Sequence, residues 1–146
     1  MFEPFTDPLY ITQPLLPELE EVDKMLETVW KSNQLTNNGN MVMLLEKELA
    51  GYLNADYLSV FSNGTVALQL ACKLLRLSGE VITTPFTFAA TVHSLAWNSI
   101  KPVFCDIEED TFNINPDLIE PLITPTTTAT SPVRVFGKPC KVEKIR

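Results

Sequence analysis

The sequence predicts an α/β protein with a mostly parallel sheet and helices on its faces. Short β-prone runs alternate with stretches of helical spacing from residue 55 onward. Strands separated by helices in this way form βαβ units, which join parallel neighbours through crossover connections. The composition is that of a globular protein, because 45% of the 146 residues are hydrophobic and 20% are charged. A chain of this length can bury a genuine core as one domain.

Two helices are expected ahead of the sheet, in a leading helical segment over residues 1–54 that precedes the βαβ units of residues 55–146. Pro17 suits the first turn of the first helix, and a polar break over residues 32–40 separates the two. The apolar positions with helical spacing are Leu16, Leu19, Val22, Leu26 and Val29, then Met41, Leu44, Leu45, Leu49 and Tyr52.

The remaining elements follow in alternation. The expected strands are residues 57–61, 80–84, 102–107 and 128–136. The expected helices are 66–74, 88–97 and 115–119, the last with Asn115 as its N-cap and Pro116 at its first position. Ligands of parallel sheets bind beyond the carboxyl ends of the strands, so the turns after Phe61, Thr84 and Asp106 are the places to look for a site.

Charge and composition exclude several classes of function. A net charge of -7 without any cluster of Lys or Arg argues against nucleic acid or an anionic membrane as a partner. No apolar run approaches the roughly 20 residues of a membrane span, and we expect a cytoplasmic protein. The three cysteines lie far apart and are expected to be reduced, and the single histidine, His93, argues against a metal site or a serine-histidine triad.

The turn Ser62-Asn63-Gly64-Thr65 is a candidate anion site. It follows an expected strand and opens a helix, so free backbone N–H groups and the positive end of the helix face outward. Gly64 allows close approach, and the hydroxyls of Ser62 and Thr65 can add hydrogen bonds to a phosphate. The alternative is that Asn63 and Thr65 are simple helix caps, and the local sequence favours neither interpretation.

Phe88 is a candidate ring-binding residue. It follows the next strand and therefore opens on the same edge of the sheet, where its face could stack on a flat heteroaromatic group. The alternative is that Phe88 is an ordinary core residue at the start of an amphipathic helix. His93 is expected to be a helix-surface or partly buried packing residue rather than an acid or base.

Six stretches of the chain resemble the DegT/StrS group of sugar aminotransferases, which depend on pyridoxal 5'-phosphate (PLP). Their order matches that group over essentially the whole chain. The stretches are residues 35–39 (LTNNG), 61–68 (FSNGTVAL), 80–91 (EVITTPFTFAAT), 101–107 (KPVFCDI), 113–116 (NINP) and 132–140 (PVRVFGKPC). The resemblance implies an incomplete large domain of the fold type I architecture of PLP-dependent transferases, in a homodimer with active sites at the subunit interface. It also implies that Ser62, Asn63, Gly64 and Thr65 hold the cofactor phosphate and that Phe88 lies against the pyridine ring.

Within this group the chain is most similar to enzymes that aminate a keto sugar nucleotide such as a dTDP-4-keto-6-deoxyhexose, with glutamate as donor, for polysaccharide or O-antigen biosynthesis. The resemblance places the family's Asp for the pyridine nitrogen and its Schiff-base Lys beyond residue 146, and Lys73 and Lys101 are on the wrong elements to replace that lysine. We therefore expect no catalytic residue in the chain and no activity of the chain alone. The last strand carries Thr130, Ser131 and Arg134 where relatives are mostly apolar, which is tolerable only if the strand is exposed.

Two other functions remain open. The first is a noncatalytic fragment or interaction module that pairs with a full-length relative through its leading helices. The second is a nucleotide-binding α/β domain with a phosphate at Gly64, although the chain lacks the GxGxxG and GxxxxGK[ST] patterns that such domains use.

Overall fold

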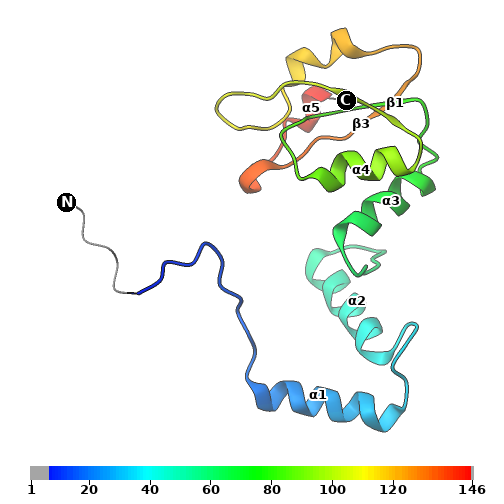
Figure 1. Cartoon of the computed structure of the whole chain (residues 1–146). Helices are drawn as coiled ribbons and strands as arrows, with labels where there is room; N and C mark the ends of the chain where they lie inside the picture. The colour runs from blue at the N-terminus through cyan, green and yellow to red at the C-terminus, as the bar shows by residue number, and fades with distance from the viewer. Residues whose placement is uncertain (1–6, 146) are drawn as a thin grey trace. The chain divides into compact units, whose positions relative to one another are not determined.

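The computed structural model describes residues 7–145, and the chain divides into two compact units, residues 1–60 and 61–146. Figure 1 shows the order of the elements along the chain. The amino-terminal unit is helical. The carboxyl-terminal unit contains the sheet.

The amino-terminal unit consists of helix α1 (Leu19–Ser32) and helix α2 (Asn40–Leu53), so both leading helices are confirmed. The placement of Pro17 in the first turn of α1 is wrong, because Glu18 has an extended backbone and is itself the N-cap. Both helices end where an asparagine, Asn33 or Asn54, adopts the left-handed conformation. Neither helix contains a buried residue.

The strand expected over residues 57–61 is wrong. This segment is irregular, and no strand in the described part of the chain pairs with it. Its one tie to α2 is a hydrogen bond of 3.0 Å from the Val60 N–H to the Glu46 carboxylate. A β-prone run forms a strand only if a neighbour supplies the lateral hydrogen bonds, and local sequence does not show whether one does.

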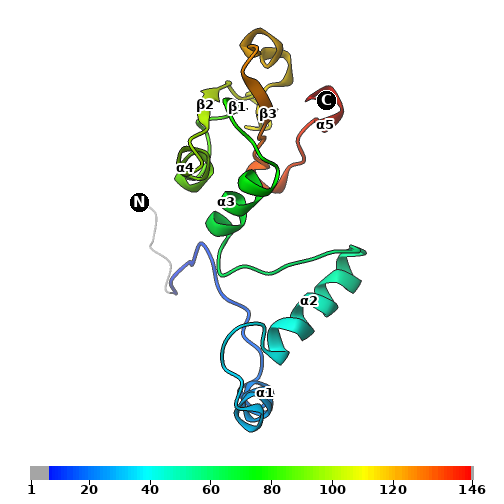
Figure 2. The same ribbon diagram turned by 90° about the vertical axis from the view of Figure 1, so that its right-hand side faces the viewer.

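The sheet of the carboxyl-terminal unit contains β1 (Glu80–Thr83), β2 (Lys101–Phe104) and β3 (Thr127–Thr130) in the order β2-β1-β3, with every pair parallel (Figure 2). The predicted α/β class with a parallel sheet is confirmed. The last strand is much shorter than the expected 128–136, because the chain leaves the sheet before Pro132 and forms a 3-10 turn, η3, at Val135–Gly137. Of the three strands only β1 is buried along its whole length. In the segment expected as the last strand, Thr130 is half-buried and Arg134 is exposed, which fits the polar sequence of that segment.

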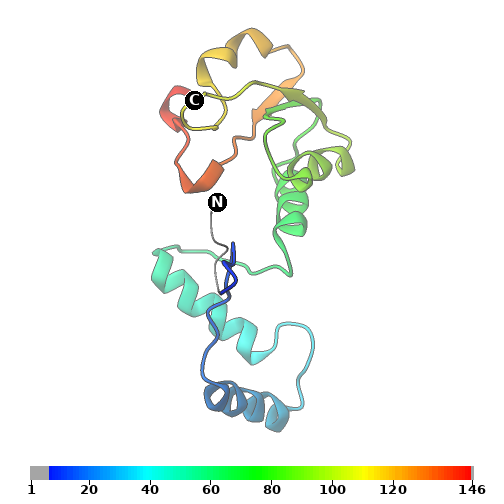
Figure 3. The same ribbon diagram turned by 60° about the vertical axis from the view of Figure 1, so that its left-hand side comes forward.

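Two small cores lie on opposite faces of the sheet, because alternate residues of β1 point to opposite sides. Val81 packs with Cys72, Leu95 and Ile100, under helix α3 (Gly64–Leu74) and helix α4 (Ala89–Trp97). Ile82 packs on the other face against the segment after β2 and the short helix α5 (Val142–Ile145), which Figure 3 shows from another side. The buried residues of this second core are Ile82, Cys105, Ile114 and Ile119.

The helix expected at 115–119 is instead a pair of 3-10 turns, η1 (Pro116–Leu118) and η2 (Glu120–Leu122). The predicted cap is confirmed, since the Asn115 side chain accepts a hydrogen bond of 3.0 Å from the Asp117 N–H. Pro121 lies inside the continuation and lacks the N–H that a longer α-helix would use. All three cysteines are free and buried.

Glu80 joins the three strands at the amino edge of the sheet. Its carboxylate accepts hydrogen bonds from the Lys101 ammonium at 2.8 Å and from the Thr124 hydroxyl at 2.6 Å. Lys101 begins β2, and Thr124 lies just before β3. These two partners, led by Lys101, hold the pKa of Glu80 below its ordinary value.

We expect the stability of the wild-type chain to fall in acid more steeply than that of the Glu80→Gln variant. A carboxylate whose pKa is lower in the folded state stabilises the fold fully above the unfolded pKa, about 4.3, and loses that contribution as the pH falls through the folded pKa. Urea unfolding followed by circular dichroism across about pH 3 to pH 7 measures the difference. Glu120→Gln, at an exposed position, is the control; parallel curves for wild type and Glu80→Gln would contradict the assignment.

Candidate functional site

The turn at the start of α3 is held by Asn63. Its side-chain oxygen accepts a hydrogen bond of 3.0 Å from the Val66 N–H, and its backbone oxygen accepts one of 3.3 Å from the Ala67 N–H. The interpretation of Asn63 as an N-cap is therefore confirmed. The phosphate-binding interpretation of the turn stays a prediction.

Two backbone donors remain open in the same turn. Within residues 7–145, the N–H groups of Gly64 and Thr65 have no hydrogen-bond partner. Ser62 and Gly64 are exposed and Thr65 is half-buried. An added Cβ at Gly64 would meet nothing within 4 Å, so the protein itself does not require glycine there. The turn thus offers an accessible pair of N–H donors at a helix N-terminus, which is a suitable arrangement for an anion.

Phe88 lies at the N-cap of α4 and is 82% exposed, so the interpretation of this residue as core is wrong. It borders a hollow of about 370 Å³ beyond the carboxyl ends of β1 and β3. The other lining residues are Pro85, Phe86, Thr87, Val133, Val135 and Phe136. None of residues 62–65 lines this hollow, although their helix α3 packs on α4.

Threonine hydroxyls shape the turn between β1 and α4. The buried Thr84 hydroxyl accepts a hydrogen bond of 3.1 Å from the Phe86 N–H, and the buried Thr83 hydroxyl donates one of 2.9 Å to the Ser131 carbonyl. The first bond fixes the direction in which the chain leaves β1. The second ties that exit to the end of β3, so both walls of the hollow start from the same pair of strands.

Three phenylalanine rings stand next to one another beside the hollow. Phe86 and Phe112 are stacked with centroids 5.6 Å apart, and Phe112 meets Phe136 edge to face at 6.0 Å. Aromatic pairs at such distances contribute about 0.5 to 1.5 kcal/mol beyond the area they bury. Three of the seven residues that line the hollow are phenylalanines and three more are apolar, so its lining suits a flat ring.

The turn after β2 is not an open site. The Asp106 carboxylate accepts a hydrogen bond of 2.8 Å from the Ile107 N–H, the Asp106 carbonyl accepts one of 2.9 Å from the Asn115 N–H, and Ile107 pairs with Ile114 in an antiparallel bridge. These bonds close the turn on itself. Lys101 is bound to Glu80 at the opposite edge of the sheet from Phe88, and His93 is exposed on α4.

Phe112, Asn113 and Phe136 are parts of this region that sequence reasoning did not single out. Their one local signal is a polar residue, Asn113, enclosed between Phe112 and Ile114 ahead of the Asn115 cap. In the described residues no group of three or more His, Cys, Asp or Glu side chains could hold a metal ion. Across residues 7–145 no helix has the length and apolar character needed to cross a membrane.

Comparison with known proteins gives consistent matches along the chain. The sequence profile of the DegT/DnrJ/EryC1/StrS aminotransferase family matches residues 18–146. The dTDP-4-amino-4,6-dideoxy-D-glucose transaminase of Escherichia coli is 48% identical over 136 residues, which are 93% of this chain and 37% of that protein. The protein of the same name from Shigella dysenteriae is 51% identical over 138 residues, 94% of this chain and 38% of its own length.

Solved structures agree with the sequence matches. DesI, crystallised in the presence of its TDP-sugar product, superposes with a TM-score of 0.89 at 35% identity, over 97% of this chain and 36% of DesI. NtdA from Bacillus subtilis with bound cofactor PMP (pyridoxamine 5'-phosphate) gives a TM-score of 0.82 at 30% identity, over 97% of this chain and 34% of NtdA. The chain thus spans about a third of the length of these relatives. With a profile match over most of its residues, the chain belongs to the DegT/DnrJ/EryC1/StrS aminotransferase family.

Proposed function

We propose that this chain supplies the phosphate- and ring-binding part of a PLP-dependent aminotransferase that acts on a keto sugar nucleotide. The observation that carries the proposal is the open start of α3. Among the described residues the backbone N–H groups of exposed Gly64 and half-buried Thr65 have no hydrogen-bond partner, and Gly64 has free space around it. The exposed ring of Phe88 on the neighbouring helix adds the second contact that such a cofactor needs.

Each residue of the turn has a distinct part in this proposal. The N–H groups of Gly64 and Thr65 donate to phosphate oxygens, and the hydroxyls of Ser62 and Thr65 add further donors. Asn63 keeps the turn open by capping α3. Phe88 presents its face to the pyridine ring. PLP itself, when bound, supplies the electron sink for moving an amino group.

The substrate is proposed from the relatives. Two of them are dTDP-4-amino-4,6-dideoxy-D-glucose transaminases, and DesI was crystallised with a TDP-sugar product. A dTDP-4-keto-6-deoxyhexose as acceptor, glutamate as donor and a homodimer as the working form are therefore our proposals for the protein to which this segment contributes. A nucleotide-binding domain is not favoured, because the profile of the aminotransferase family accounts for residues 18–146.

We expect Gly64→Ala to weaken binding of PMP roughly tenfold without destabilising the chain. The new methyl group meets no protein atom, and alanine is a better helix former than glycine by up to about 1 kcal/mol. The new methyl group does, however, lie where a phosphate must approach the N–H groups of residues 64 and 65. Isothermal titration with PMP, which lacks the aldehyde that reacts with surface lysines, gives the affinity, and urea unfolding gives the stability.

Gly51→Ala is the matched control for this experiment. Gly51 lies in α2, and an added Cβ there also meets nothing within 4 Å, so the same substitution should leave PMP binding unchanged. Equal affinity of Gly64→Ala and wild type, or no saturable binding of PMP by the wild-type chain, would contradict the proposed cofactor site.

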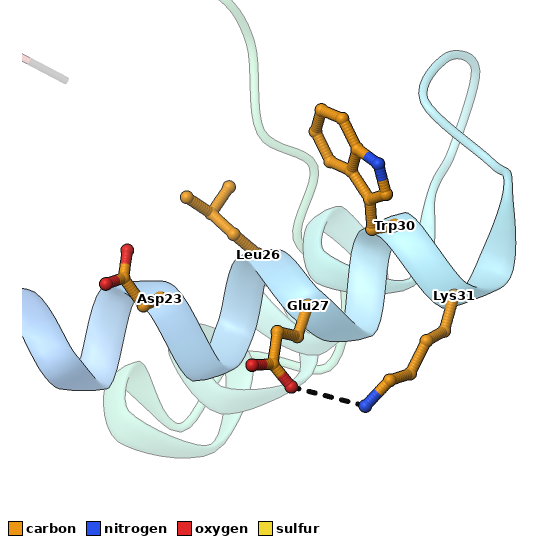
Figure 4. A pocket seen from close by; sticks show the side chains of 5 residues that line it. All are labelled: Asp23, Leu26, Glu27, Trp30 and Lys31. Atoms are coloured by element: carbon orange, nitrogen blue, oxygen red, sulfur yellow. Dashed lines mark hydrogen bonds and ion pairs between the residues drawn. The ribbon is translucent and has the colours of Figure 1, made fainter.

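A second candidate function is pairing with a full-length relative through the amino-terminal unit. The observation in its favour is an apolar groove of about 370 Å³ between α1 and α2, lined by Val22, Met25, Leu26, Val29, Met41, Leu44, Leu45 and Glu48. On the outer surface of α1, Leu26 and Trp30 project in the same direction, away from the ion pair of Glu27 and Lys31 (Figure 4). Exposed apolar surface of this kind is typical of protein interfaces.

A further inference from the structure

We propose that Asn113 is a positioning residue that holds the aromatic wall of the hollow beside Phe88, an inference that rests on the cofactor site proposed above. It assigns a role to a side chain that does not itself line the hollow but binds the backbone of one lining residue, Val135. The proposal depends on the bonds of one buried amide and on the backbone of two phenylalanines.

Asn113 is only 2% exposed, and both the oxygen and the nitrogen of its side-chain amide make hydrogen bonds to one loop. Its Nδ2 donates hydrogen bonds of 3.2 Å to the Lys138 and Pro139 carbonyls, and its Oδ1 accepts one of 2.8 Å from the Val135 N–H. The loop of residues 133–139 is therefore clamped on both sides of Phe136. Replacing such an amide leaves buried polar groups unpaired, which destabilises the position of the loop.

The clamped loop forms one wall of the hollow. Val133, Val135 and Phe136 line it opposite the turn that carries Phe86 and Phe88. Phe112, the residue before Asn113, contacts both Phe86 and Phe136. Asn113 thus connects, through its backbone and its side chain, the two segments that supply the aromatic cluster.

Phe112 and Phe136 both have an unfavourable backbone conformation. Phe112 has φ 60° and Phe136 has φ 50°, in the left-handed region that non-glycine residues rarely occupy. Such a conformation is strained for a residue with a side chain and persists only when its surroundings fix it. Asn113 contributes three hydrogen bonds to fixing this pair, and the bond from the Val135 N–H is fully buried.

The contacts at the surface between the segment that carries Phe112 and the loop of residues 133–139 are weaker than the hydrogen bonds of Asn113. The Lys138 ammonium donates a hydrogen bond of 3.0 Å to the Asp110 carbonyl, and Lys141 is paired with Glu108. Lys141, followed by the Thr111 hydroxyl, lowers the pKa of Glu108. Both lysine side chains reach solvent, where such pairs contribute little. The buried amide therefore determines where the loop lies.

The first test is the affinity of Asn113→Asp for PMP, measured by titration at neutral pH. We expect roughly tenfold weaker binding than wild type, equal to about 1.4 kcal/mol, because a carboxylate cannot donate to the Lys138 and Pro139 carbonyls. Hydrogen exchange of the peptide containing residues 133–140, measured without ligand, should show faster exchange at Val135 in the variant.

Acid should partly restore the affinity of Asn113→Asp for PMP. A general loss of stability would not produce such a recovery. Burial beside two carbonyls raises the pKa of the new carboxyl group, and its protonated form regains one donor. We expect the ratio of variant to wild-type affinity to rise from pH 8 to about pH 5. The charged residues on the two segments are present in both proteins, so the ratio isolates the substitution; they are Glu108, Glu109, Asp110, Arg134, Lys138 and Lys141.

Asn98→Asp is the matched control. The Asn98 amide also donates two hydrogen bonds to carbonyls, 3.1 Å to Gln69 and 2.9 Å to Ser94, but it joins α3 to α4 away from the clamped loop. This variant should lose stability and keep its PMP affinity within about twofold, with no recovery in acid. Unchanged affinity of Asn113→Asp while wild type binds would overturn the positioning role and leave the cofactor site standing. Unchanged exchange at Val135 would overturn the clamp itself, whether or not wild type binds PMP.

Discussion

The Gly79→Ala variant should lose about 2 to 4 kcal/mol of folding free energy, the largest loss that we expect from a single added methyl group in this chain. Gly79 has φ +64°, and a Cβ built on it lies 2.4 Å from the Thr126 carbonyl oxygen. That oxygen accepts the Glu80 N–H at 2.9 Å, and the Gly79 carbonyl accepts the Lys101 N–H at 2.8 Å. Relieving the clash must therefore disturb the entry to all three strands.

The Gly137→Ala variant distinguishes the effect of the steric clash at Gly79 from the effect of placing alanine in the left-handed conformation. Gly137 has φ +77°, but an added Cβ there meets nothing within 4 Å, so this variant should lose only the roughly 1 to 2 kcal/mol of a left-handed alanine. Urea unfolding of both variants, monitored by circular dichroism, provides the comparison. Equal losses at the two positions would show that the contact with Thr126 does not constrain the fold.

The Leu45→Asp variant should fail to retain a full-length relative that the wild-type chain retains. Leu45 lines the apolar groove between α1 and α2 and is 49% exposed. A carboxylate at this position therefore stays hydrated in the free chain and reduces the folding stability only slightly. In a closed interface the same charge must be desolvated without a partner. The penalty is about 2 kcal/mol or more, which is roughly a 30-fold loss of affinity.

The experiment uses an immobilised chain and the full-length Escherichia coli transaminase that is 48% identical to it. Leu53→Asp is the control, because Leu53 lies on the same helix, is 59% exposed and does not line the groove. Retention of the transaminase by wild type and Leu53→Asp, with loss for Leu45→Asp, would support the interaction module. Equal retention by all three proteins would contradict the use of the groove.

The elements that could be predicted from the sequence are those in which local pattern and tertiary environment agree. Helices α1 to α4 have helical spacing of apolar residues, and β1 is a short β-prone run that the structure buries on both faces. The run at 57–61 has equally β-prone residues but no lateral partner in the described residues, which its own sequence cannot reveal. The strand expected to end at Phe136 stops at Thr130 because the clamped loop competes with the sheet for that segment.

The candidate site shows the same division. The turn at Gly64 and the ring of Phe88 could be predicted, because each directly follows a β-prone run and opens a helix. The aromatic cluster of Phe86, Phe112 and Phe136 could not, because its members come from three loops that only the folded chain brings together. Asn113 escaped notice for a related reason: its partners are backbone groups more than 20 residues away, and backbone groups leave no sequence pattern.

The two outer margins of the sheet differ in how they resist polymerisation. Lys101 and Cys105 direct their N–H groups toward β1, so Pro102 and Phe104 take the outward positions of β2, and of these two Pro102 has no N–H to offer a foreign strand. On β3, Thr128 and Thr130 take the outward positions and retain their N–H groups. Stacking of molecules into fibrils should therefore begin at β3, and a proline or lysine introduced there would be the first measure for keeping concentrated solutions of this chain clear.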